Sequence, residues 1–88
     1  MIFEHRRTDP HHIQGLSDLD LGEVGTVQTI RLQGKLRNYI MRFGLVEGVR
    51  VLVVRRVPLG QLRVYRIGQS EIALRPETAQ QIMVTRNQ

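Results

Sequence analysis

Short strand-like segments separated by Gly and Pro turns fill the second half of the chain, and they restrict the fold more than any other feature. At the centre of residues 49–57 (VRVLVVRRV), successive side chains are all apolar, so both faces of an extended segment would be apolar there. This pattern is typical of a strand covered on both faces. PLGQ at 58–61 is a turn, because Pro58 fixes one backbone angle and Gly60 permits a positive one. Residues 62–67 (LRVYRI) then return along the first segment. We therefore predict a β-hairpin.

Three further segments make the chain mainly β. The first predicted strand lies within EVGTVQTIRL at 23–32, EIALR at 71–75 alternates, and IMVT at 82–85 forms a short last strand. Pro76 opens a helical turn before that last strand. Since closure removes exposed sheet edges in a small domain, we predict a small β-barrel of about five strands.

One short amphipathic helix interrupts the strands. Leu36, Ile40 and Phe43 recur at helical spacing within KLRNYIMRF (35–43), and the basic residues fall largely on the opposite side. Gly44 follows where a left-handed cap would end the helix. The predicted fold class is thus mainly β, with one α-helix inserted after the first strand.

The glycines of RFGLVEGVRV (42–51) are spaced like those of a phosphate-binding loop, but their surroundings argue against that function. A Walker-type loop ends in Gly-Lys-Ser/Thr, whereas Val49 and Arg50 follow Gly48. The pair also separates a helix C-terminus from a strand, where the negative end of the helix dipole repels phosphate. We interpret Gly44 and Gly48 as turn residues.

Domain organisation and composition limit the chemistry further. Residues 1–15 have little periodicity, so we expect a poorly ordered N-terminal extension before a single domain at 16–88. The absence of cysteine excludes disulfides, thiolate metal sites and cysteine nucleophiles, and favours the cytoplasm. No apolar run approaches the roughly 20 residues of a membrane span, and the N-terminus lacks the pattern of a signal peptide.

Catalytic and metal-binding patterns are weak. Ser17 and Ser70 are the serines of the chain, and their surroundings are typical of a helix cap and a turn. We therefore predict no enzymatic activity and no required cofactor. The imidazoles are His5, His11 and His12, all in the extension, and adjacent residues of an extended chain point to opposite sides. A solvated tail is the favoured interpretation, with His11 and His12 as candidates for weak divalent metal binding.

Arginine dominates the charge. Thirteen basic and eight acidic residues give a net charge of +5, which suits nucleic acid, an anionic membrane surface or an acidic protein. A hairpin turn near Leu59 brings Arg55 and Arg63 roughly opposite, and like charges in that position destabilise a sheet. Two interpretations stay open, namely that an anionic partner binds there or that Glu47 or Glu71 offsets the charge.

The hairpin is the predicted partner-binding surface. Nucleic-acid barrels usually add aromatic stacking platforms, and Tyr65 alone is available on the hairpin, which argues against nucleic acid. An anionic inner leaflet is a further candidate, since each nearby basic residue contributes about 1 kcal/mol. A flat strand edge beside a thin core favours dimers or trimers as a further expectation. The predicted contact residues are Arg55, Arg56, Leu59, Arg63 and Arg66.

The order of segments resembles the FeoA family, small proteins that assist bacterial ferrous-iron uptake. The resemblance covers Leu16 to Val84 and rests on LSDLDLGEVGTV, GKLRNYIMRFGLVEGVRVLV, VPLG and IALRPETAQQIMV in that order. It implies an SH3-like β-barrel with an inserted helix. After the Pro-Leu-Gly turn the family commonly continues with Asp-Pro, where this chain has Gln61 and Leu62. That difference alters loop chemistry at the predicted contact surface.

The resemblance also implies a cytoplasmic partner of FeoB, the membrane ferrous-iron transporter that carries a GTPase domain. The expected function is that of a small accessory protein, located in the cytoplasm or at the inner membrane, that binds or regulates the transporter. The same small barrel resembles the C-terminal domain of DtxR-type iron-dependent repressors, so a regulatory module is the alternative. A basic nucleic-acid-binding barrel is the third hypothesis.

Overall fold

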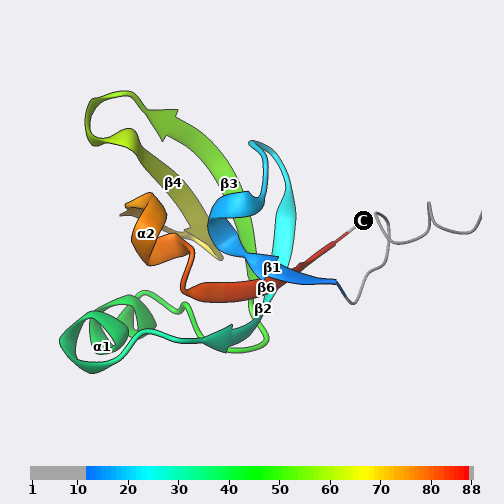
Figure 1. Ribbon diagram of the computed structural model, residues 1–88, viewed down its shortest axis with the longest axis vertical. Coiled ribbons are helices and arrows are strands. Elements are labelled where there is room, and N and C mark those ends of the chain that lie inside the picture. The colour runs from blue at the N-terminus through cyan, green and yellow to red at the C-terminus, as the bar shows by residue number, and fades with distance from the viewer. Residues whose placement is uncertain (1–11, 88) are drawn as a thin grey trace, which may run out of the picture.

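The computed structural model describes residues 12–87 and shows a curved antiparallel sheet with one inserted helix (Figure 1). The sheet order is β1-β6-β2-β3-β4-β5, and neighbouring strands are antiparallel. The prediction of a mainly β fold with a helix after the first long strand is confirmed. The elements in chain order are β1 (Ile13–Gly15), the 3-10 turn η2 (Leu16–Asp18), β2 (Val24–Ile30), α1 (Gly34–Arg42), β3 (Arg50–Val57), the 3-10 turn η3 (Leu59–Gln61), β4 (Leu62–Ile67), β5 (Ser70–Leu74), α2 (Pro76–Ala79) and β6 (Ile82–Arg86).

The core lies on the concave face of the sheet. Alternate residues of β4 and β5 point inward, because successive side chains of a strand face opposite sides. Tyr65 and Ile67 of β4 are buried in this way, and Ile40 attaches α1 to the same cluster. η2 covers one end of the barrel through Leu16, which is fully buried with Leu19. The small domain thus forms one continuous apolar core.

A sixth strand extends the sheet beyond the predicted domain boundary. Ile13 and Gly15 pair with Thr85 and Met83 of β6, although both lie in the segment that we expected to be an extension. The folded part therefore starts earlier than residue 16, and the strands number six among the described residues. Residues 1–11 of that extension, including His5 and His11, lie outside the described residues.

The two glycines of the helix–strand connection are turn residues, as predicted. Gly44 has φ +92°, and its N–H donates to the Met41 carbonyl at 3.0 Å, which closes the last turn of α1. Gly48 has φ +94°, and its N–H donates to the Val27 carbonyl at 2.8 Å. A phosphate loop keeps such N–H groups free for the ligand, whereas here both are used by the fold.

The hairpin register differs from the prediction. Val53 pairs with Tyr65 and Arg55 pairs with Val64, so one additional residue of β3 forms a β-bulge between them. The expected Arg55–Arg63 opposition is therefore wrong, and Arg56 is the residue opposite Arg63. A single inserted residue shifts all later positions, and nothing in the local pattern of β3 signals it.

Candidate functional site

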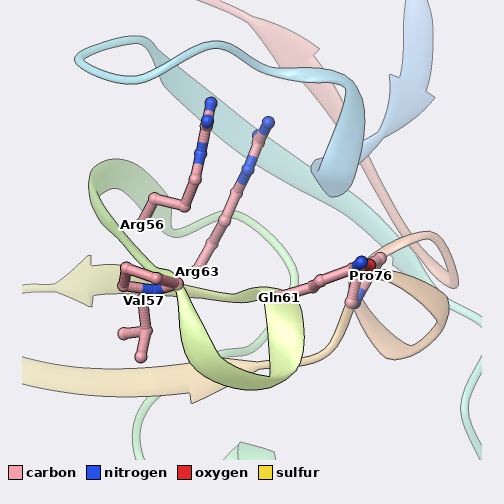
Figure 2. Close-up of a pocket in the computed structure, with 6 residues that line it drawn as sticks. Arg56, Val57, Gln61, Arg63 and Pro76 are labelled. Carbon is pink, nitrogen blue, oxygen red and sulfur yellow. The ribbon is translucent and has the colours of Figure 1, made fainter.

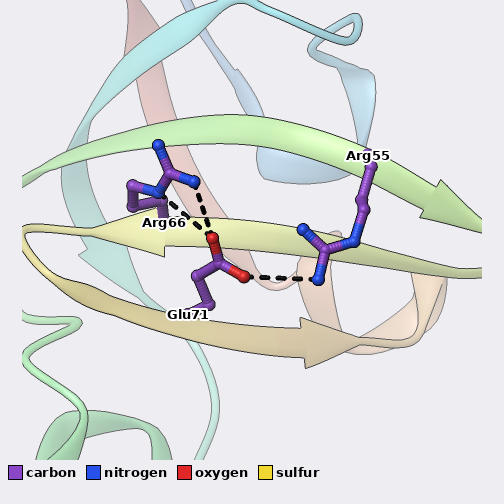
Figure 3. Close-up of polar contacts among 3 residues, drawn as sticks. All are labelled: Arg55, Arg66 and Glu71. Carbon is purple, nitrogen blue, oxygen red and sulfur yellow. Dashed lines mark hydrogen bonds and ion pairs between the residues drawn. The ribbon is translucent and has the colours of Figure 1, made fainter.

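Strand alternation divides the predicted contact arginines between the two faces of the β3–β4 hairpin, and the bulge places Arg56 on the face of Arg63. Arg55 and Arg66 lie on the outer face, where both reach Glu71 of β5 (Figure 3). Arg66 donates to the Glu71 carboxylate at 2.7 Å through Nη2 and at 3.2 Å through Nε, and Arg55 Nη2 approaches it at 3.3 Å. Glu71 thus bridges two arginines that both remain largely exposed.

Glu71 is the acid that offsets the outer-face charge. The hydrogen bond from Arg66 is the main reason that the pKa of Glu71 lies below its ordinary value, and the charges of Arg55 and Arg66 act in the same direction. Of the two acids suggested by the sequence, Glu71 is the one that pairs with these arginines, and Glu47 forms no ion pair within residues 12–87. Glu71 therefore neutralises one of the two positive charges that Arg55 and Arg66 place on the outer face.

Arg63 lies on the inner face and connects the hairpin to η2. Its Nη1 donates to the Leu19 carbonyl at 2.5 Å and to the Ser17 carbonyl at 3.3 Å. These two carbonyls follow the start of η2, which has too few residues to satisfy them within the turn. Arg63 therefore holds the β3–β4 hairpin against the end of the barrel.

Arg56 stands beside Arg63 on the same face. Figure 2 shows the two side chains extending in parallel toward the same side of the hairpin. Within residues 12–87, neither guanidinium has an acidic side chain within ion-pair distance. A pocket of about 240 Å³ adjoins this pair, and its lining consists of Arg56, Val57, Pro58, Gln61, Arg63 and Pro76.

A second, smaller cavity continues the first. It has a volume of about 100 Å³ and shares Arg63 and Pro76 with the larger pocket. Tyr65 is among its lining residues but is only 1% exposed. Burial raises the pKa of the Tyr65 hydroxyl, while the charge of Arg63 and a hydrogen bond from it act in the opposite direction. A side chain this deeply buried offers no face on which a nucleic-acid base could stack.

The hairpin tip adds an apolar contact and a strained backbone to the rim of the pocket. Leu59 in η3 is 85% exposed, so the structure places this predicted contact residue at the tip. Gln61 has φ +56°, the left-handed conformation that non-glycine residues rarely adopt. Neither Gln61 nor Pro76 was predicted as a contact residue. Pro76 comes from α2, which approaches the hairpin only in the folded chain, whereas the departure from the family's Asp-Pro at Gln61 and Leu62 was the one available signal for Gln61.

Metal-binding residues are sparse in the part of the chain that the structure describes. His12 is exposed, and residues 12–87 contain no group of three His, Cys, Asp or Glu side chains placed to hold a metal ion. His11, the other candidate, lies outside the described residues. Neither α1 nor α2, the helices within this range, is long and apolar enough to cross a membrane.

Solved structures with the same fold include FeoA proteins. FeoA from Chlorobium tepidum is 27% identical with a TM-score of 0.78, over 84% of this chain and 70% of that one. FeoA from Stenotrophomonas maltophilia, an SH3 domain protein solved with zinc, is 26% identical with a TM-score of 0.67, over 80% and 87% of the two chains. The predicted SH3-like barrel is thereby confirmed.

A manganese-dependent transcriptional repressor shares the fold at 22% identity. Its TM-score is 0.74, and the match spans 85% of this chain but 42% of the repressor. No curated protein sequence matches the chain. The FeoA domain model, in contrast, matches residues 14–86, which include every strand except the first residue of β1. The chain therefore belongs to the FeoA family.

Proposed function

We propose that this protein is a non-enzymatic accessory protein of bacterial ferrous-iron uptake that binds the cytoplasmic part of a FeoB-type transporter. The observation that carries the proposal is the match of the FeoA domain to residues 14–86, nearly the whole described chain. The pocket beside Arg56 and Arg63 supports a binding role. The proposed location is the cytoplasm, at the inner surface of the membrane that holds the transporter.

The inner face of the hairpin is the proposed contact surface. Arg55 and Arg66 are paired with Glu71, whereas Arg56 has no acidic partner among the described residues. Leu59 adds an exposed apolar side chain at the tip of the same hairpin, and arginine is enriched at protein interfaces. We therefore narrow the predicted contact set to Arg56, Leu59 and Arg63.

A regulatory module is the second candidate function. The repressor with the same fold supports it, because the matched part makes up 42% of that protein and is thus one part of a larger regulator. Such a module would act on another protein within a regulatory complex. Recovery of a DNA-binding protein with the tagged chain, in place of a transporter, would favour this candidate.

Co-purification from membranes tests the proposal. The full chain with an affinity tag is expressed in the source cells, membranes are solubilised in mild detergent, and retained proteins are identified by mass spectrometry. We expect enrichment of a FeoB-type transporter over a tag-only control. Recovery equal to that control, from membranes in which the transporter is present, would refute the proposed partner.

A further inference from the structure

We propose that the pocket beside Arg56 and Arg63 is a carboxylate-binding site that takes an Asp or Glu side chain of an extended protein segment. The inference rests on the proposed function and adds the chemistry by which the partner is recognised. Arg56 and Arg63 occupy directly opposed positions of β3 and β4, where like charges destabilise a sheet. A carboxylate placed between them converts this repulsion into attraction.

The site is partly built before any ligand arrives. The Arg63 guanidinium donates to the Leu19 and Ser17 carbonyls through Nη1 and also interacts with the Tyr65 hydroxyl. A guanidinium has five N–H donors, so donors remain for another acceptor. Arg56 extends in parallel with it in Figure 2. Two guanidinium groups with a common direction suit a carboxylate, because each supplies charge-assisted hydrogen bonds in a fixed geometry.

The walls of the pocket fit a peptide better than an isolated ion. Val57, Pro58 and Pro76 line the pocket together with the arginines, so apolar atoms adjoin the two charges. Gln61, which is in a left-handed conformation, lies on the same rim, and such strain concentrates at binding sites. An acidic side chain would enter between the arginines while its neighbouring residues contact the apolar wall formed by Val57, Pro58 and Pro76.

Charge distribution favours a protein segment over a lipid surface. Lipid-binding patches gather about four to eight basic residues on one side. Here the hairpin arginines are divided, since Arg55 and Arg66 lie on the outer face and pair with Glu71. The inner face presents two guanidinium groups, one of which already binds backbone carbonyls. This arrangement is local and directional, as recognition of a single carboxylate requires.

An NMR titration with two matched peptides tests the site. The probes are the tetrapeptides LEDL and LQNL, both acetylated and amidated so that side chains carry the only carboxylates. We expect LEDL to shift the signals of Arg56, Gln61 and Arg63 in the full chain, and LQNL to bind at least tenfold more weakly. Equal binding of both peptides, or shifts confined to the outer face, would overturn the proposal.

Substitutions at neighbouring positions provide the control. Arg56→Gln and Arg55→Gln remove the same charge from adjacent residues on opposite faces of the hairpin. Loss of a charge-assisted hydrogen bond is expected to weaken LEDL binding about 10- to 100-fold in Arg56→Gln. Arg55→Gln is expected to stay within about twofold. Equal affinities of the two variants, at unchanged melting temperatures, would contradict the assignment.

Two further measurements separate this proposal from its alternatives. In the first, the chain is sedimented with phosphatidylglycerol vesicles. If the wild type and Arg55→Gln bind the vesicles and Arg56→Gln does not, the ligand of the pocket is a lipid headgroup and the inference is overturned. In the second, the tagged Arg56→Gln variant is used in the co-purification. If it recovers as much transporter as the wild-type chain does, the proposed site is wrong while the proposed function stands. If the wild-type chain binds LEDL as described but recovers no transporter, the site stands and the proposed function fails.

Discussion

Replacing Arg63 with methionine tests how the hairpin is fixed to the barrel. The substitution keeps an unbranched apolar stem but removes the guanidinium that donates to the Leu19 carbonyl at 2.5 Å and to the Ser17 carbonyl at 3.3 Å. A hydrogen bond to a charged group contributes about 1.5–3 kcal/mol, and the longer of these two contributes less. Because Arg63 is half-buried, water would solvate part of what the substitution exposes. We therefore expect a loss of about 2–3 kcal/mol.

This loss is large for a domain of this size. A chain of 88 residues has a free energy of unfolding of about 4–13 kcal/mol, and each kcal/mol corresponds to about 4–8 °C in melting temperature. Thermal unfolding followed by circular dichroism should show a decrease of about 8–24 °C in melting temperature, and urea unfolding should show the corresponding loss of free energy. Arg63→Lys keeps the positive charge but lacks the planar guanidinium with its several N–H donors. Its melting temperature should lie between those of the wild type and Arg63→Met.

Arg66→Met is the matched control on the outer face. Its ion pair with Glu71 is exposed, so its removal should lower the melting temperature by much less. If Arg63→Met melts within about 2 °C of the wild type, or if both variants lose the same stability, the carbonyls at η2 are satisfied without Arg63. Arg63 would then not be the residue that holds the β3–β4 hairpin against η2.

Four further changes test other parts of the structure. The hydrogen bond from Arg66 lowers the pKa of Glu71 below its ordinary 4.5. The ionised Glu71 therefore stabilises the fold above that pH, and this stabilisation is lost as pH falls. Glu71→Gln should flatten the decline in melting temperature between about pH 5 and pH 3. Burial raises the pKa of Tyr65 above 10.0, so the free energy of unfolding should fall as pH rises past that value. Tyr65→Phe should remove this loss, together with the phenolate absorbance that develops at the highest pH. Gly44→Ala should cost about 1–2 kcal/mol in urea unfolding, because φ is +92°. Gly25→Ala should cost about 1–3 kcal/mol in the same assay, because the new methyl group would lie 3.1 Å from the Val84 side chain.

The parts of the fold that could be predicted depend on local patterns. The helix was recognisable because Leu36, Ile40 and Phe43 repeat at helical spacing, and its end was recognisable because Gly44 can adopt a positive φ. The hairpin followed from apolar runs on either side of a Pro-Gly turn. Each of these signals lies within about ten residues of the feature that it predicts.

The features that could not be predicted depend on distant contacts. β1 has three residues, too few to show alternation, and it exists because β6 supplies its hydrogen bonds. The bulge in β3 has no local signal, yet it determines that Arg56 rather than Arg55 faces Arg63. The candidate site was therefore predicted as a single cluster of arginines, whereas the structure divides it into an outer pair that shares Glu71 and an inner pair without an acidic partner among residues 12–87.

Direct measurement of affinity for the transporter tests the central claim. The purified full chain is titrated by isothermal calorimetry into a purified FeoB-type transporter from the same cells, at low and at physiological salt. We predict saturable binding that weakens as salt increases and that Arg56→Glu disrupts far more than Arg55→Glu. Absence of saturable binding at low salt, with both proteins folded, would contradict the claim that this FeoA-family protein acts on that transporter.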